Sequence, residues 1–195
     1  MTRVESIEDF GKLIDRCIAY GDAIVEGDAD ATDPFHDVDL KPTGAAQPLE
    51  ANFSIFRTRE LEEIFERYQA GELKNLATIQ EDALTARNGS NGRQDFRRRL
   101  EERKVSAVER SNQNMQRALA EVKKYGDSFW IKVGDLLVVA AKAVLDFFKQ
   151  ILSMIIKFFS DVLSCFSSTG YENCANTFYK TMKQAVLGAL KAIFS

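Results

Sequence analysis

The strongest pattern of hydrophobic and polar positions lies between Phe129 and Phe166. On a helical wheel at about 100° per residue, the polar residues fall into one stripe covering about a third of the circumference. Aliphatic and aromatic residues fill the other two thirds. A face this wide needs neighbours on three sides, so the pattern predicts a long apolar helix, about 129–166, at the centre of a bundle or against lipid. The polar stripe comprises Lys132, Asp135, Lys142, Asp146, Lys149, Gln150, Ser153, Lys157, Ser160, Asp161 and Ser164.

Two shorter amphipathic stretches precede this helix. Residues 5–26 repeat apolar positions with a helical period, with Ser6 as a candidate N-cap and Gly27 as the stop. The same period resumes over 58–86, where Gly71 predicts an interruption and therefore a pair of helical segments.

Two breakers divide the rest of the chain. The run from Arg87 to Gly92 predicts a loop, followed by a long, mostly polar helix over 94–125. Gly126 to Ser128 predicts a stop and a new N-cap before the apolar helix. Residues 167–170 predict a turn, and a final helix follows within 172–195. Because no period-2 alternation occurs, we expect an all-α fold: one domain over 1–195, a helical bundle of about five to six helices around the apolar helix.

The segment 28–51 differs from its surroundings. It is acidic at first and contains every proline of the chain, Pro34, Pro42 and Pro48. It has few large apolar residues and no clear period, so we expect a flexible loop on which little of the core depends. On this interpretation the segment is dispensable for folding.

Charge is distributed unevenly. The apolar back half, 129–195, holds seven lysines against four acidic residues, a net charge of +3, so the remainder carries −6 of the overall −3. An acidic front half joined to an apolar, mildly basic back half is typical of membrane-directed or self-inhibiting chains.

Cysteine usage and the N-terminus bear on the compartment. The first ten residues lack the apolar run of a secretory signal, which predicts a cytoplasmic protein with a possible peripheral membrane position. The odd number of cysteines favours reduced thiols. Cys165 and Cys174 flank the predicted turn at 167–170 and are able to pair if oxidised, whereas Cys17 lies in the first helix.

Candidate chemistry is sparse. His36 is the only histidine, which argues against Ser-His-Asp and Cys-His nucleophiles and against multi-histidine metal sites. Residues 28–39 place carboxylates at calcium-loop positions, but Asp33 stands where that loop requires glycine, so we interpret it as a solvated acidic loop. The basic run 93–104 lacks stackable aromatics and fits a solvated helix face better than a nucleic-acid site. We therefore expect neither an enzyme nor a cofactor.

In organisation alone, the chain resembles helical membrane-active modules such as colicin-type pore domains and the helical cell-death domains of fungal and plant immune proteins. The resemblance covers the pattern only and transfers no residues. It implies apolar helices kept inside a soluble bundle until a trigger opens it. Charges in every 19-residue window of the apolar helix argue against a conventional spanning segment.

The pattern thus predicts a non-enzymatic protein that associates with or remodels an anionic membrane, including trigger-dependent pore formation. The alternative is a soluble scaffold whose apolar strip binds a partner helix. In both cases we expect a homo-oligomer and no nucleic acid. The residues expected to contact the membrane or partner are Phe147, Phe148, Phe158, Phe159, Lys180, Lys183, Lys191 and Phe194.

Overall fold

The computed structural model describes residues 3–40 and 58–194, with the backbone alone at 131–133 and 194, and every element in that range is a helix. The predicted all-α helical bundle is confirmed. Its elements are α1 (Ile7–Glu26), α3 (Arg59–Ala86), α4 (Gly92–Ser164), the short 3-10 helix η2 (Cys165–Ser167) and α5 (Tyr171–Phe194).

Local capping sets the ends of the first helices. The Ser6 side chain accepts a hydrogen bond from the Asp9 amide at 3.1 Å, and Gly27 ends α1 in the left-handed region at φ 84°. Thr58 caps α3 in the same way, accepting from the Leu61 amide. The interruption predicted at Gly71 is wrong, because α3 continues through it. A Cβ at Gly71 would meet nothing within 4 Å, and one solvent-facing glycine costs a helix only about 1 kcal/mol.

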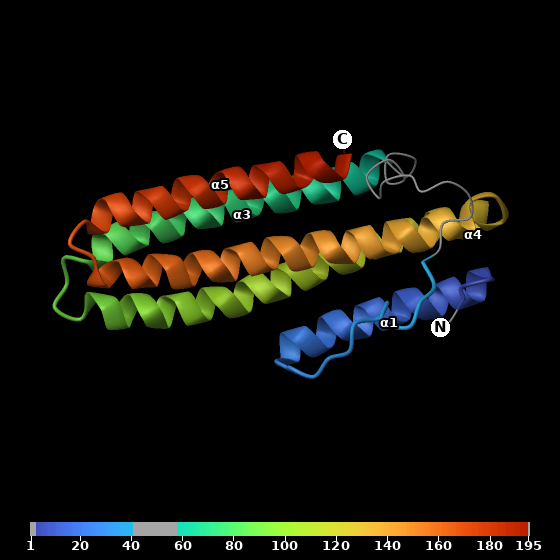
Figure 1. Ribbon diagram of the computed structural model, residues 1–195, viewed down its shortest axis with the longest axis horizontal. Helices are drawn as coiled ribbons and strands as arrows, with labels where there is room; N and C mark the ends of the chain where they lie inside the picture. The colour runs from blue at the N-terminus through green and yellow to red at the C-terminus, as the bar shows by residue number, and fades with distance from the viewer. Residues whose placement is uncertain (1–2, 41–57, 195) are drawn as a thin grey trace.

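The 73-residue α4 doubles back on itself. The Ser111 hydroxyl donates to the Phe148 carbonyl at 3.4 Å, whereas a straight helix would separate these residues by about 55 Å. The rings of Phe96 and Phe166 likewise lie 5.4 Å apart. Figure 1 shows the two halves of α4 running side by side and meeting at one end of the molecule. We call residues 92–124 the first arm, 125–134 the bend and 135–164 the second arm.

The chain reverses direction at the predicted stop, Gly126–Ser128, but its backbone stays helical through the bend, so the helices expected at 94–125 and 129–166 are the two arms of one element. Gly126 is buried, and a Cβ there would lie 3.2 Å from Phe10 and 3.3 Å from Leu137. Glycine at this position allows α1 and the second arm to approach the bend closely. It serves packing and does not end the helix.

The helices lie on two sides of the α4 hairpin (Figure 1). α3 and α5 lie side by side against one face of its arms, and α1 lies against the opposite face near the bend. Polar contacts join α3 to α5: Gln69 donates to the Val186 carbonyl at 2.7 Å, and the Tyr171 hydroxyl donates to the Ala83 carbonyl at 2.6 Å.

Residues 28–40 continue from α1 along the same face of α4. Phe35 and Val38 are buried in the core, and the Lys142 ammonium lies 5.8 Å from the centre of the Phe35 ring. The expectation that little of the core depends on segment 28–51 is thus wrong for residues 28–40, because two apolar side chains anchor it. Residues 41–51 lie outside the described residues. We call α1 together with residues 28–40 the cover.

The cysteines differ from the expectation of reduced thiols. A disulfide joins Cys165 to Cys174 across the turn between α4 and α5, because these helices fold back on each other and bring their ends together. Cys17 is free and buried in α1, and its burial raises the pKa of the thiol to about 12.

Candidate functional site

The four phenylalanines expected to enter lipid lie inside the bundle. Phe147, Phe148, Phe158 and Phe159 are each 6% exposed or less. The Phe65 ring of α3 lies 4.6 Å from that of Phe147 and 5.4 Å from that of Phe148. In this conformation the second arm therefore presents its aromatic face to α3 and to the rest of the core.

The polar stripe of the second arm forms its outer surface. Among the described residues, no member of the predicted stripe is buried. Two ion pairs lie along it: Lys142 with Asp146 at 2.6 Å and Lys157 with Asp161 at 2.5 Å. Lys149 instead reaches out of its helix to Asp33 of the cover.

Charged and polar side chains attach the cover to α4. The Lys149 ammonium lies 3.1 Å from an Asp33 carboxylate oxygen, and within the cover itself Arg16 of α1 contacts Asp37 at 2.6 Å. Asp22 of α1 accepts hydrogen bonds from Asn112 and Gln116 of the first arm, both at 2.9 Å. Among the helices, α1 packs almost entirely on α4, so the cover depends on one partner element.

The Lys149–Asp33 contact is ionised at neutral pH. Burial opposes the charge of Asp33, but the Phe35 amide, 2.8 Å away, and the Lys149 ammonium outweigh it and hold the pKa of Asp33 below 3.8. Burial also opposes the charge of Lys149, yet Asp33 and Tyr20 raise its pKa above 10.5. Acid protonates Asp33 and so weakens this attachment.

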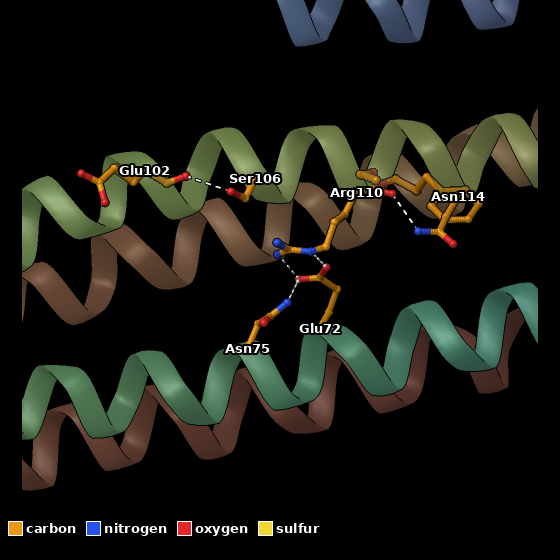
Figure 2. A network of polar contacts seen from close by, with 8 residues as sticks. Glu72, Asn75, Glu102, Ser106, Arg110 and Asn114 are labelled. Carbon is orange, nitrogen blue, oxygen red and sulfur yellow. Dashed lines mark hydrogen bonds and ion pairs between the residues drawn. The ribbon is translucent and has the colours of Figure 1, made fainter.

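A second polar contact lies on the opposite side of the hairpin. Glu72 of α3 is 1% exposed and accepts from the Arg110 guanidinium of the first arm at 2.8 and 3.3 Å (Figure 2). Asn75 also donates to Glu72, at 3.3 Å. The sequence carries a signal for this site, because Glu72 falls on the helical face that also carries Phe65, Leu76 and Ile79.

The structure does not gather the predicted contact residues into one exposed surface. Lys180, Lys183 and Lys191 lie exposed on α5, whereas the four phenylalanines are buried beneath other helices. The side chain of Phe194 lies outside the described residues. A lipid or partner surface combining both groups would require the bundle to open.

Exposed apolar side chains occur instead at the bend of α4. Phe129 is 45% exposed and Ile7 of α1 is 37% exposed, and the Ile7 side chain contacts the bend, within 3.4 Å of a Cβ built at Gly126. Phe129 and Ile7 fall in two separate predicted helices, 129–166 and 5–26. The sequence signal for this exposed surface is the close spacing of three aromatic residues, at positions 125, 129 and 130.

The remaining candidate groups do not form a chemical site. Within residues 3–40 and 58–194, no three His, Cys, Asp or Glu side chains are arranged to hold a metal ion. No helix of that part is both long and apolar enough to cross a membrane. In the basic run, Arg103 contacts Asp82 at 2.5 Å and Arg98 contacts Asp95 at 3.8 Å.

No family model, curated protein or solved structure matches this chain. Its function is therefore inferred from these contacts and from their physical chemistry.

Proposed function

We propose that this chain is a non-enzymatic protein that associates with anionic membranes after its helical bundle opens. The observation that supports the proposal is the burial of the second arm. Its phenylalanines are at most 6% exposed, and the face opposite α3 and α5 is closed by a cover packed on α4. Displacing that cover would expose apolar side chains of α1 and of α4 near the bend, such as Phe10 and Leu137, whereas exposing Phe147 and Phe148 also requires α3 to move away from the second arm.

The attachment of the cover suggests acid as one means of opening it. The Asp33–Lys149 pair loses its attraction when Asp33 is protonated, and the segment is then held by the apolar contacts of Phe35 and Val38 and by the Arg16–Asp37 contact to α1. The exposed lysines of α5 supply the attraction to anionic lipid, on the order of 1 kcal/mol each near the surface.

The proposed position is peripheral. An amphipathic helix can lie in the interface with its charged stripe towards water, and this avoids placing Lys149 or Asp161 in the hydrocarbon. A disulfide such as Cys165–Cys174 fits an oxidising compartment better than the cytoplasm. We therefore propose a peripheral position at a membrane and do not assign the membrane to a cellular compartment.

Vesicle sedimentation with a weakened cover tests this function. Phe35→Ala removes the largest buried apolar side chain of residues 28–40, and Leu76→Ala removes a buried side chain of α3 while leaving the cover intact. Each is mixed with phosphatidylcholine vesicles containing phosphatidylglycerol, at pH 7 and pH 3. We expect Phe35→Ala to bind at pH 7 more strongly than wild type and Leu76→Ala.

Wild type should bind more at pH 3 than at pH 7, because the pKa of Asp33 lies below 3.8. If wild type and Phe35→Ala both stay in the supernatant at both pH values, the proposal is wrong. Light scattering of that supernatant then tests the alternative function, because a soluble scaffold should show a discrete oligomer.

A further inference from the structure

The bend of α4 carries a small exposed aromatic surface. Tyr125 and Phe129 stack with their ring centres 4.7 Å apart, and Trp130 packs on Phe10 of α1 with ring centres 5.5 Å apart. Tyr125 and Trp130 are partly exposed, and Ile7 adds its 37% exposed side chain. We call Ile7, Tyr125, Phe129 and Trp130 the aromatic tip. In Figure 1 the bend lies at one end of the molecule, away from the α3–α4 loop.

This surface does not depend on opening of the bundle. Its side chains are accessible while the second arm is buried, and packing holds them in place. A Cβ at Gly134 would lie 3.0 Å from the Trp130 ring, so the indole lies directly over the backbone of the bend. The tip is thus a preformed feature of the closed molecule.

The size of the tip argues against a second copy of the chain as its partner. A fully exposed aromatic side chain offers about 150–250 Å², so Phe129 presents about 100 Å² at 45% exposure and the whole tip roughly 300 Å². A stable protein interface needs about 800 Å² on each partner. A convex tip of this size is sufficient for insertion into a fluid surface but not for a dimer.

The residue types of the aromatic tip indicate which kind of fluid surface it can enter. Trp and Tyr concentrate at the boundary between headgroups and acyl chains, because each combines an apolar ring with a polar group. The neighbouring charges balance, with Lys123 and Lys124 against Glu121 and Asp127. Insertion here therefore depends on apolar area and not on lipid charge.

We infer that the aromatic tip inserts into the interfacial region of a phospholipid bilayer and docks the closed bundle before it opens. The inference rests on the proposed membrane association and names its first contact. It separates two tasks: the tip provides charge-independent docking, and the α5 lysines provide attraction to anionic lipid.

The single tryptophan of the chain makes a direct test possible, because Trp130 belongs to the tip. The full chain at pH 7 is titrated with phosphatidylcholine vesicles at high salt, which suppresses the contribution of the lysines. We expect the Trp130 emission to shift to shorter wavelength and to be quenched by lipids brominated near the headgroup. Phe129→Ser should weaken partitioning about tenfold.

Val105→Ser is the matched control, since Val105 is 58% exposed on the first arm, far along α4 from the bend. It should partition as wild type does. An unchanged Trp130 emission with these vesicles, or equal partitioning of Phe129→Ser and wild type, would overturn the inference. So would a dimer in lipid-free solution that Phe129→Ser abolishes. Binding of anionic vesicles at pH 3 without any Trp130 response would reject the tip alone and leave the proposed function standing.

Discussion

Glu72 occupies a position on α3 where its neighbours along the same face are apolar. Its carboxylate is 1% exposed and its principal partner is the Arg110 guanidinium, with Asn75 as a lesser donor. A buried ion pair of this kind adds little stability over an apolar pair, but removal of one partner leaves an uncompensated charge. The pair therefore fixes which residue of α3 faces which residue of the first arm.

Arg110→Met should therefore lower the free energy of unfolding by about 3 kcal/mol, because Glu72 would remain buried without its cation. The double variant Glu72→Met with Arg110→Met should return to within about 1 kcal/mol of wild type. Chemical denaturation at pH 7 measures both. Arg67→Met is the control: Arg67 pairs with Glu63 on the surface of α3, and its loss should cost under about 1 kcal/mol. Equal costs for Arg67→Met and Arg110→Met would contradict the role given to Glu72.

Replacing glycine with alanine should change the stability of the protein in opposite directions at two positions. Gly71 lies inside α3 with open space around a Cβ, so Gly71→Ala should stabilise the protein by about 0.5–1 kcal/mol. At Gly92 a Cβ would lie 1.6 Å from the Ala86 carbonyl oxygen, so Gly92→Ala must move the α3–α4 loop and should be destabilising. Thermal unfolding followed by circular dichroism measures both shifts, and a common sign would contradict the backbone approach at Gly92.

At the scale of an element, residues 28–40 are held by two ion pairs, Asp33 with Lys149 and Asp37 with Arg16, and by two apolar anchors. Because the pKa of Asp33 is lowered in the folded state, its carboxylate contributes stability above the unfolded pKa near 3.8 and loses it as pH falls through the lower native pKa. The contribution is complete above about pH 5. Asp33 and Lys149 are both partly exposed, so solvent screening keeps it below about 1 kcal/mol.

Asp33→Asn should therefore reduce the free energy of unfolding at pH 7 and have no effect once the pH is well below 3.8. Asparagine keeps the oxygen that accepts from the Phe35 amide, so the substitution removes the charge alone. Denaturant titrations at pH 7 and pH 3 measure the difference. Asp30→Asn, an exposed neighbour in the same acidic segment, should change neither value. A pH-independent loss for Asp33→Asn would show that the Lys149 contact carries no stability.

Local signals predicted the helix ends well. Ser6 and Thr58 cap their helices through side chain to amide contacts three residues away, and Gly27 ends α1 through a backbone conformation that glycine adopts easily. Both depend on a few neighbouring residues, so the sequence contains all the information. Gly71 and Gly126 lack such a determinant: one faces open space and the other accommodates a neighbouring helix, and both remain helical.

The periodic pattern of the sequence does not predict contacts between residues that lie far apart in the chain. The helical wheel identified the apolar face of the second arm correctly, but it carries no information on whether that face meets protein or lipid. Asp33 and Lys149 hold the cover to α4 although more than a hundred residues separate them, and no periodic pattern connects their two segments. The aromatic tip arises only because α4 folds back and α1 packs beside the bend.

At the scale of the whole molecule, the apolar surface is divided between a small exposed tip and a large buried arm, and the exposed lysines lie on a third element. Attraction to anionic lipid should therefore come from α5 and be separable from both apolar contributions. Each lysine near the membrane surface is worth about 1 kcal/mol, and the attraction weakens with salt because of screening.

Replacing Lys180, Lys183 and Lys191 with Glu should weaken binding to anionic vesicles by about 3 kcal/mol or more, and high salt should have the same effect on wild type. All three side chains are exposed, so the helical circular dichroism should not change. The same net charge can be produced elsewhere by replacing the exposed Lys74, Arg97 and Lys104 with Glu. If that second triple variant loses as much affinity as the first, net charge controls binding and α5 is not the face that approaches the membrane. A selective loss in the α5 variant, with Trp130 still responding to phosphatidylcholine, would assign electrostatic attraction to α5 and docking to the tip.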